Sequence, residues 1–485
     1  MNIKYHLSDW QLKIILSNFI KALTIFFVLF LEAPDNLCKA QNLINSGLIV
    51  YNAPAGAEQN KDFTIQVREE GGKWSDLFGY NAVNMNKGPF PGQEKTPLNN
   101  QTFAYFDSDF RHRIEVKVSK NSGNFSSVRI RPLSYGLKFT QKGNSVSFFL
   151  DNPRKISVEF DKDIYHNLFL FANPVETNAP HEGDPGVTYF GPGIHEAGTI
   201  NLITGGIVYL AGGSIVKGNI RGKGITGASV KGHGILQNGG IKIDYSNNIT
   251  IEGIIIINSP GWCIVPSQVD NSLIRDVKII NNGISTDGAD PCGCRNLTFD
   301  NVFFRIPDDC ISIKCYKVTR PNLDMVIKNS VFWSDAAHCI LIGPEGNGLS
   351  TERVLITNCD FPECKYTGSD YWGVFAITNG DNMTIRDITI ENCRVEDFSF
   401  SNLVAFRIET NMWVKAPGGP IKNIVFRNIK FNGNNEHLNY IKGYDETRSV
   451  DSVRFENLQI NGKRIMSAEE GNFRIGPFVK NVIFN

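Results

Sequence analysis

The chain has 485 residues, of which 41% are hydrophobic and 20% charged, with 45 glycines and 33 phenylalanines. These proportions are typical of a globular protein, and the absence of long Ala/Leu/Glu/Lys-rich tracts favours an all-β fold. The formal net charge is zero, which excludes a bulk electrostatic attraction to nucleic acid or to an anionic membrane surface.

The first 40 residues have the pattern of a secretory signal peptide. An apolar run, Phe19–Leu31, follows two lysines and precedes Cys38-Lys39-Ala40, a small-residue cleavage site. Its most apolar part, residues 22–31, is too short to span a membrane comfortably. We expect a secreted or periplasmic protein that is not stably inserted in a membrane after cleavage. An uncleaved membrane anchor is the alternative.

Residues 41–182 alternate short apolar runs with turn residues. Segments such as HRIEVKVSK (residues 112–120) and KISVEFDKD (residues 155–163) show period-two patterning and are separated by Gly- and Asn-rich turns. Short strands at regular spacing predict an N-terminal β-sandwich. The pattern changes within APHEGDPGVTYFGPG (residues 179–193), which puts the expected domain boundary near Gly183.

From residue 183 to residue 485 the chain repeats one unit: a short apolar strand, a turn residue and a second apolar strand. NLTFDNVFFR (residues 296–305) and RVLITNCDFP (residues 353–362) are examples. The turn residues are Gly253, Asp276, Asn301, Asn329, Asn358, Asp387, Asn428 and Asn457, at spacings of 23, 25, 28, 29, 29, 41 and 29 residues. A fixed period indicates a solenoid, and β-units predict that each repeat is one coil of a parallel β-helix. Leucine-rich repeats are disfavoured because their consensus is absent.

Nine of the ten cysteines follow residue 260. Cys292 and Cys294, and the pair Cys359 and Cys364, lack the CxxC spacing and histidine partners of a structural zinc site. Buried thiols or a few disulfides are the simpler interpretation for an exported protein.

Asp287, Asp308, Asp309 and His338 lie 7 to 11 residues after three successive turn residues. They should therefore stack on three successive coils, which repeat about every 4.8 Å. Three carboxyl groups on one face repel, so at least one has a raised pKa, and a proton-holding acid beside ionised partners is what glycosidic cleavage requires. Inverting cleavage needs carboxyl groups about 6.5–9.5 Å apart, which neighbouring coils are expected to supply.

Four motifs in order resemble those of the polygalacturonase-like clan of glycoside hydrolases, families 28 and 49. STDGAD (Ser285–Asp290) is similar to Asn-Thr-Asp-Gly, and PDDCISIK (Pro307–Lys314) contains Asp-Asp-Cys. AHCILIGPEG (Ala337–Gly346) resembles Gly-His-Gly-Ile-Ser-Ile-Gly, and RIET (Arg407–Thr410) resembles Arg-Ile-Lys. The resemblance implies a right-handed, pectin-lyase-like parallel β-helix. The additional N-terminal domain is more similar to family 49, which includes dextranases and isopullulanases.

The resemblance also implies roles. Asp308 takes the place of the general acid, while Asp287 and Asp309 take those of the residues that position and deprotonate water. His338 would tune the acid or contact the sugar. Substrate contacts are implied for Arg407, Lys314, Glu409 and Tyr444. Glu409 stands where the family has lysine and would oppose a uronate carboxylate, so a neutral glycan is the alternative to galacturonan.

Simpler interpretations accompany these roles. Asp287 has good turn neighbours, and Asp290 is an alternative acid on the water side. His338 is alternatively a core histidine, and Arg407 a solvent-facing side chain. The aromatic residues that would stack on sugars or belong to the core are Tyr371, Trp372 and Trp413. Acid clusters can bind calcium, but hydrolysis by this clan needs no metal, so neither metal nor cofactor is expected.

The sequence therefore predicts a secreted, polygalacturonase-like inverting glycoside hydrolase that acts as a monomer on a pectic polysaccharide and has no nucleic-acid partner. A dextranase- or isopullulanase-like α-glucan hydrolase is the first alternative. A polysaccharide lyase is the second, although it would need an Arg or Lys base. A non-catalytic carbohydrate-binding solenoid is the third, but it would have no reason to concentrate three acids on one strand position.

Overall fold

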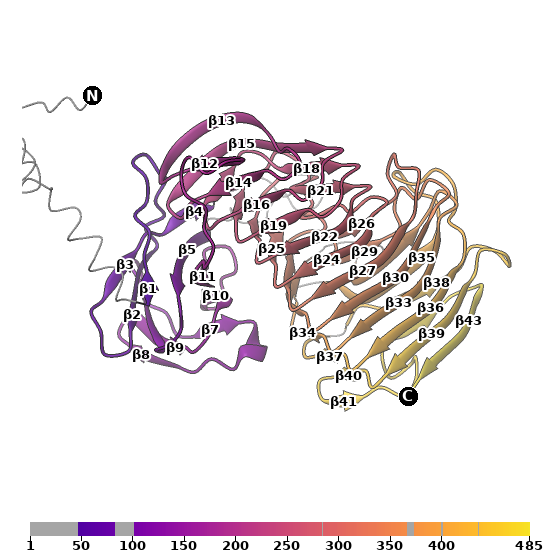
Figure 1. The fold of residues 1–485 in the computed structure, drawn as a ribbon. Coiled ribbons are helices and arrows are strands. Elements are labelled where there is room, and N and C mark those ends of the chain that lie inside the picture. Colours follow the sequence, from indigo (N-terminus) through magenta and orange to yellow (C-terminus); the bar gives the residue numbers. More distant parts are fainter. Residues whose placement is uncertain (1–46, 83–100, 284, 366–372, 399–400, 435) are drawn as a thin grey trace, which may run out of the picture.

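The computed structural model describes residues 47–82, 101–283, 285–365, 373–398, 401–434 and 436–485 (Figure 1). Within these ranges the chain forms strands, one short 3₁₀ helix, η1 (Leu133–Tyr135), and no α-helix. No helix in these ranges is long and apolar enough to cross a membrane. The predicted signal peptide, together with Tyr371 and Trp372, lies outside the described residues.

The N-terminal strands form two sheets. One contains β1 (Leu48–Ile49), β4 (Tyr80–Ala82), β5 (Gln101–Ser108), β7 (Val128–Arg131), β10 (Arg154–Phe160) and β11 (Leu168–Pro174). The other contains β2 (Phe63–Glu69), β3 (Ser75–Leu77), β6 (Ile114–Lys120), β8 (Phe139–Lys142) and β9 (Ser145–Leu150). Apolar side chains of both sheets share one buried cluster, to which alternate residues of β2, β6 and β9 contribute. The period-two pattern of these strands therefore reflects one buried face and one exposed face.

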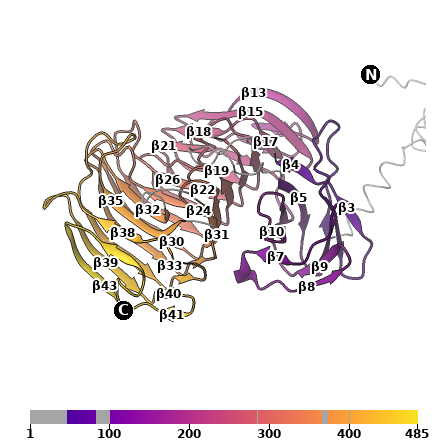
Figure 2. The same ribbon diagram turned by 180° about the vertical axis from the view of Figure 1, so that it is seen from behind.

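The rest of the chain winds through three parallel sheets (Figures 1 and 2). The first contains β12 (Val187–Phe190), β14 (Ile207–Leu210), β16 (Ser229–Lys231), β19 (Thr250–Glu252), β22 (Asp270–Arg275), β24 (Arg295–Asp300), β27 (Asn322–Lys328), β30 (Ser350–Thr357), β33 (Thr384–Glu391), β36 (Ile421–Arg427), β39 (Val450–Glu456) and β43 (Val479–Phe484). The second contains β13 (Gly193–Asn201), β15 (Ser214–Lys223), β17 (Ile235–Gln237), β18 (Ile241–Asp244), β20 (Ile255–Ile257), β21 (Ile264–Ser267), β23 (Lys278–Ile280), β25 (Phe303–Ile306), β28 (Val331–Ser334), β31 (Asp360–Cys364), β34 (Arg394–Val395), β37 (Lys430–Phe431), β40 (Gln459–Ile460) and β41 (Lys463–Arg464). The third contains β26 (Ile311–Ile313), β29 (Ile340–Ile342), β32 (Gly373–Asn379), β35 (Asn402–Ile408), β38 (Asn439–Lys442) and β42 (Phe473–Ile475). The predicted parallel β-helix is confirmed.

The turn residues of the repeats adopt the left-handed backbone conformation that Asn, Asp and Gly tolerate. All eight predicted turn residues have positive φ, between 53° and 84°. Their side chains bond from coil to coil: the Asn358 amide donates to Asn329 Oδ1 at 2.8 Å, and the Asn457 amide donates to Asn428 Oδ1 at 2.9 Å. Each coil therefore fixes the corner of the next.

One predicted turn position is displaced. The Asn428 amide donates to Asn392 Oδ1 at 3.1 Å, so Asn392 and not Asp387 continues this corner. Asp387 lies inside β33, where its φ of 59° belongs to a second line of left-handed residues and its carboxylate accepts from the Asn423 amide. The sequence prediction was misled because both positions carry residues suited to the same backbone conformation.

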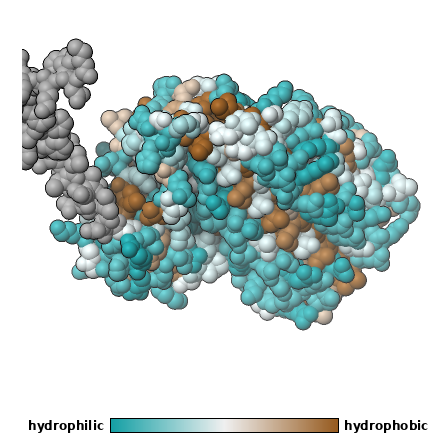
Figure 3. All heavy atoms as spheres, in the orientation of Figure 1, coloured by the Kyte–Doolittle hydropathy of each residue, from teal (hydrophilic) through white to brown (hydrophobic). Residues whose placement is uncertain are grey.

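The interior of the β-helix is a continuous column of Ile, Val, Phe and Leu side chains. The described cysteines, from Cys263 to Cys393, are buried free thiols, most of them within this column. They behave as small hydrophobic residues, in agreement with the buried-thiol interpretation. The face shown in Figure 3 is mostly hydrophilic, with apolar side chains in small scattered groups.

The N-terminal part packs directly against the β-helix. In β5, Ala104 and Phe106 face the N-terminal cluster, while Phe103 and Tyr105 face a second cluster that includes Trp333 of the β-helix. Strands β5 and β11 are thus buried on both faces, which explains their unbroken apolar runs.

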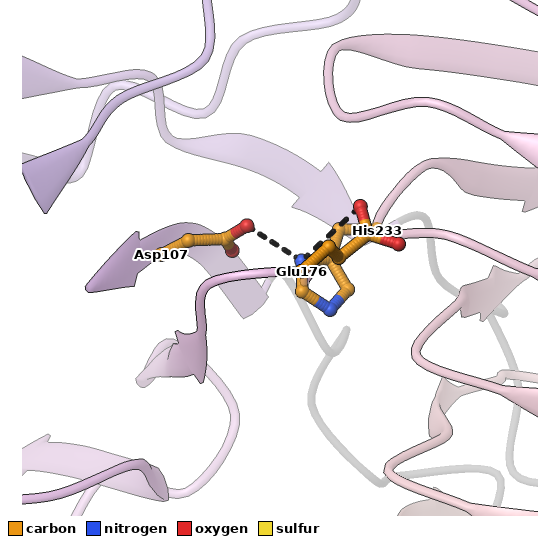
Figure 4. A group of neighbouring side chains, drawn as sticks. All are labelled: Asp107, Glu176 and His233. Carbon is orange, nitrogen blue, oxygen red and sulfur yellow. Dashed lines mark hydrogen bonds and ion pairs between the residues drawn. The ribbon is translucent and has the colours of Figure 1, made fainter. Parts of the chain in front are cut away.

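A polar contact accompanies this packing (Figure 4). His233, between β16 and β17, lies with its Nδ1 2.7 Å from Asp107 Oδ2 and 4.0 Å from Glu176 Oε2. The Tyr51 hydroxyl donates to Asp107, and the Tyr209 hydroxyl donates to Glu176 at 2.8 Å. The carboxylates therefore already have protein partners, and the group joins β5 to the first coils of the β-helix.

Candidate active site

A cavity of about 200 Å³ opens at the bends that precede β26 and β29. It is lined by Trp262, Ser285, Asp287, Asp308, Asp309, Lys314, His338, Leu341, Pro344, Glu345 and Trp413. The structure thus brings together the four side chains predicted to be catalytic and Lys314.

Backbone register explains why these side chains meet. The amide of Gly288 donates to the Asp309 carbonyl, and the amide of Cys310 donates to the His338 carbonyl, both at 2.9 Å. Asp287, Asp309 and His338 therefore occupy equivalent positions on three successive coils. Asp308 is one residue out of this register and is more exposed than Asp309. Both aspartates lie in the bend before β26 and line the same cavity, but Asp309 is buried against His338 whereas Asp308 is more exposed.

The three carboxyl groups are closer than the sequence suggested. Asp287, Asp308 and Asp309 each offer an oxygen atom, and these atoms lie within 4.8 Å of one another. That is shorter than the separation of about 6.5–9.5 Å expected of an inverting pair. The close spacing follows from the coil repeat of about 4.8 Å, which directly separates Asp287 from Asp309.

Asp309 is held as a carboxylate by His338. The Nδ1 atom of His338 lies 2.6 Å from Asp309 Oδ1, and the His338 amide donates to the same oxygen at 3.3 Å. Burial acts to raise the pKa of Asp309, but the charge and hydrogen bonds of His338 outweigh it and lower the pKa below its ordinary value. Asp309 therefore stays ionised to lower pH than an ordinary aspartate does.

Asp287 is in contact with Lys314, whose Nζ lies 3.0 Å from Asp287 Oδ2 and 2.9 Å from Asp290 Oδ1. Burial and the neighbouring Asp309 raise the pKa of Asp287, whereas Lys314 and a hydrogen bond with Asp290 act to lower it. The balance leaves this pKa raised, with Lys314 as the main group that favours the ionised form.

Asp308 has the environment of a proton donor. Burial raises its pKa well above the ordinary value, and the charges of Asp287 and Asp309 raise it further. Among the described residues, neither Lys314 nor His338 forms a salt bridge with Asp308; Lys314 contacts Asp287 and His338 contacts Asp309. Asp308 therefore retains its proton at pH values where Asp309 has lost its own. The three carboxyl groups are also close enough together to offer oxygen ligands to one cation.

Aromatic side chains form the walls of the cavity. The Trp262 ring lies 3.9 Å from Lys314 Nζ and meets Tyr316 edge-on, with ring centroids 5.7 Å apart. Trp413 is 42% exposed. Such exposed aromatic faces suit the apolar faces of sugar rings.

Three residues predicted to contact substrate line no part of this cavity. Arg407, on β35, occupies the register of Lys314 but lies two strands beyond β29, roughly 10 Å along the axis. It is buried, so the solvent-facing alternative is wrong; its Nη1 atom is 4.0 Å from Glu409 Oε2, and its guanidinium is 5.4 Å from the Tyr440 ring centroid. Tyr444 is 44% exposed in the connection after β38. The substrate contacts of these three residues stay predictions.

The sequence analysis missed Trp262 and Glu345. Trp262 lies one coil before Asp287 in the same register, since the Cys263 amide donates to the Asp287 carbonyl. Counting back one more coil would have found it. Glu345 follows the His338 motif, and its carboxylate lies 3.6 Å from Lys314. A second cavity of about 710 Å³ shares Glu345 and Trp413 with the first, so the two adjoin.

The model of glycosyl hydrolases family 28 matches residues 210–473, more than half of the chain and all of the cavity lining. The protein belongs to glycosyl hydrolase family 28. It is therefore a glycoside hydrolase that acts on a polysaccharide, and the resemblance inferred from the four motifs is confirmed. The lyase and non-catalytic alternatives are not supported.

Similarity to known proteins covers most of the chain. An isopullulanase of Aspergillus niger is 24% identical over 447 residues, covering 73% of this chain and 75% of the relative. A probable polygalacturonase of Vitis vinifera is 28% identical over 116 residues, and this chain spans only 24% of its length. Among solved structures, Dex49A from Penicillium minioluteum superposes with a TM-score of 0.53 and 17% identity, covering 90% of this chain and 97% of that chain. This last likeness concerns the fold.

Proposed function

We propose that this enzyme hydrolyses the glycosidic bonds of a neutral α-glucan by a single displacement that inverts the anomeric centre. Asp308 donates a proton to the leaving oxygen. Asp287 and Asp309 hold a water molecule, and Asp287 takes its proton as the water attacks the anomeric carbon. The observation that carries the proposal is the difference between the three adjoining acids: the pKa of Asp308 is raised well above its ordinary value, that of Asp287 is raised, and Asp309 is held as an anion by its contact with His338.

The burial of the two water-side acids supports inversion over a covalent mechanism. Asp287 and Asp309 are only 3% and 6% exposed. A covalent nucleophile has to reach bonding distance of the anomeric carbon, whereas these carboxylates can reach it through a water molecule. We therefore attribute the short distance between Asp287 and Asp309 to their binding of one shared water molecule. We do not attribute it to the nucleophile and acid of a retaining mechanism.

The charge of the cavity supports a neutral substrate. Among the described residues, four acids line it: Asp287, Asp308, Asp309 and Glu345. The basic side chains in this lining are already engaged, Lys314 with Asp287, Asp290 and Glu345, and His338 with Asp309. A uronate carboxylate would meet uncompensated negative charge here, which costs free energy in a partly buried site.

The name of the most extensively aligned of these relatives points the same way. The isopullulanase, whose name denotes action on the α-glucan pullulan, is similar over 73% of this chain, whereas the polygalacturonase match covers 22%. The longer alignment supports a shared substrate class more than the shorter one does.

A pectic substrate is the second candidate. The family match and the names of several relatives favour it. The adjoining cavity is lined by Lys317 and Lys415, which lie where uronates bound away from the cleavage point could meet them.

Substrate and mechanism are tested together. Purified enzyme is incubated with pullulan, dextran, polygalacturonan and rhamnogalacturonan, and the first-formed anomer is followed by NMR. We expect reducing ends from an α-glucan with inverted configuration. Cleavage of polygalacturonan alone would establish the pectic candidate, and a retained anomer would contradict the single displacement.

Asp308→Asn removes the proton donor without changing its size. It should lower kcat by about 10²–10⁴-fold, the usual contribution of general acid catalysis. Asp324→Asn, at an exposed ion pair with Arg353, is the matched control and should leave kcat unchanged. Full activity of Asp308→Asn on every glycan would exclude Asp308 as the acid.

We also propose that the enzyme acts outside the cytoplasm, on the basis of the signal pattern in residues 1–40. Expression with this segment should deliver the enzyme to the periplasm or medium. N-terminal sequencing should then show that the mature chain begins after Ala40. Recovery of the unprocessed chain in the cytoplasm would contradict export.

A further inference from the structure

Asp290 is a titratable group beneath the cavity that the mechanism above does not use. It is 0% exposed, and it is not among the cavity-lining residues. It lies three residues after Asp287 on the same coil. Lys314 contacts both carboxyl groups, at 3.0 Å for Asp287 and 2.9 Å for Asp290.

The charges around Lys314 do not balance unless a proton is present. Its ammonium group is shared by Asp287, Asp290 and, at 3.6 Å, Glu345. Three carboxylates and one ammonium would leave two uncompensated negative charges in a largely buried region. Because burying an unpaired charge is expensive, a carboxyl group in such a place takes up a proton instead.

Two observations place that proton on Asp290. Apart from Lys314, no donor among the described residues reaches either of its oxygen atoms, so only this shared ammonium compensates a charge there. The same Lys314 Nζ also contacts Asp287, at 3.0 Å, so the two carboxyl groups compete for one positive charge, and a proton on Asp290 leaves that charge to Asp287. Burial raises the pKa of Asp290 well above its ordinary value, and the charge of Asp287 adds to this.

We propose that Asp290 is a positioning residue that stays protonated and donates a hydrogen bond to Asp287, and that Asp290 and Lys314 together keep Asp287 ionised and oriented toward the attacking water. The proposal rests on the proposed function, which assigns proton transfer from water to Asp287. No bond to Asp290 changes during the reaction, and its proton remains on it throughout.

Replacement by asparagine tests the proton directly. In Asp290→Asn the new amide would present an N–H to Asp287 and a carbonyl oxygen to Lys314, as a protonated aspartic acid does. Asp290→Asn should therefore keep kcat/KM within about threefold of the wild type, with an unchanged pH profile. If Asp290 were instead a required anion, this variant would lose activity as severely as Asp308→Asn, and the proposal would be overturned.

Removing the donor should shift the pH profile. Asp290→Ala withdraws the hydrogen bond that favours ionised Asp287, so the pKa of Asp287 rises. The acidic limb of kcat/KM should move upward by about one to two pH units, while the alkaline limb set by Asp308 stays in place. Lys314→Met should move the same limb in the same direction. An unshifted acidic limb in a folded Asp290→Ala enzyme would contradict the proposal.

Infrared difference spectroscopy gives a readout that does not depend on activity. The wild type at neutral pH should show the carbonyl stretch of a protonated carboxyl group that is missing in Asp290→Asn. Absence of any difference would overturn the assignment of the proton. This result is separate from the proposed function, whose failure would appear as activity that survives Asp308→Asn.

Discussion

At the scale of single residues, Asp308 and Asp309 differ because the bend before β26 gives the two adjacent side chains different partners. Asp309 points to His338 on the next coil and becomes an anion. Asp308 lines the cavity, where burial and two neighbouring acids raise its pKa. The adjacent pair therefore supplies opposite protonation states at the same pH, as acid–base catalysis requires.

His338 should control the acidic side of the pH profile. Its positive charge is the main cause that lowers the pKa of Asp309, so Asp309 stays ionised as the pH falls. In His338→Gln this charge is lost and the pKa of Asp309 rises. Asp309 then takes up a proton at higher pH, and its protonation adds to that of Asp287, so the acidic limb of kcat/KM should move upward and become steeper.

The measurement is kcat/KM from about pH 3 to about pH 8, a range that includes the ordinary pKa values of carboxyl groups. His195→Gln serves as control, because His195 lies on β13 and its ring nitrogen contacts the Gly191 carbonyl, away from the cavity. An acidic limb that stays in place in His338→Gln would mean that Asp309 is kept ionised by something other than His338.

At the scale of elements, the sequence predicted the turn residues that recur in every coil. It did not predict which side chains of neighbouring coils are aligned, because that depends on the register of strand pairing. Asn301 and Asn329 were found because a left-handed corner restricts residue choice in every coil. Trp262 was missed because the acid motifs begin one coil later, at Asp287, so the coil that starts at Gly253 was not searched; the hydrogen-bonded register aligns Trp262 with Asp287. The order of the motifs predicted that Arg407 contacts substrate. Strand pairing puts Arg407 two strands beyond β29, outside the cavity lining.

The connection between β35 and β36 supplies a wall of the substrate site. It carries Trp413, which lines both adjoining cavities. If a glycan chain extends from the first cavity into the second, the ring should stack on a sugar away from the cleaved bond. Trp413→Ala should raise KM for long oligosaccharides by about 5–150-fold, equivalent to the stacking value of about 1–3 kcal/mol seen for other ring ligands, and affect the shortest substrates much less.

Two further variants test whether the cavity lining or the motif resemblance identifies the residues that contact substrate. Phe139→Ala changes an aromatic residue that is 39% exposed on β8 of the N-terminal part and should leave KM unchanged. Tyr444→Ala tests the residue that the motif resemblance favoured. A large effect of Tyr444→Ala together with none of Trp413→Ala would show that substrate runs along a different path.

At the scale of the whole molecule, the N-terminal part and the β-helix are joined by a buried apolar interface. The apolar–polar pattern along a single strand does not reveal this interface. Period-two patterning identifies one buried face, whereas β5 and β11 are buried on both. The second face was not predicted because its partners, such as Trp333, lie far away in sequence. Polar contacts cross the same boundary, including His233 with Asp107 and Lys155 with Asp276.

Arg131 is a fully buried charge at this boundary. It lies at the end of β7, is 0% exposed, and stacks over the Trp333 ring at 4.6 Å. Its guanidinium is 2.8 Å from Glu159, 3.7 Å from Glu363 and 3.8 Å from Glu396. Burial raises the pKa of Glu396 to about 7, although Arg131 acts to lower it.

Arg131→Met should destabilise the protein by about 3–5 kcal/mol, because it leaves buried carboxylates without their cation. The loss should grow with pH. Without Arg131 the folded-state pKa of Glu396 rises further above its unfolded value of about 4.3, so the native state binds more protons than the unfolded state. Stability therefore falls as the pH rises from the unfolded pKa toward the folded pKa.

The test compares urea unfolding midpoints of Arg131→Met and the wild type at an acidic and a mildly alkaline pH. Arg129→Met is the matched control, since Arg129 also pairs with Glu159 but its side chain is 24% exposed, and Arg129→Met leaves the fully buried Arg131 in place, so it should cost less stability than Arg131→Met. Adding Glu396→Gln to Arg131→Met should recover part of the stability at the higher pH by removing a charge that would otherwise stay buried. Equal loss at both pH values would show instead that Arg131 stabilises the boundary through its packing on Trp333, and that the three carboxylates are satisfied without it.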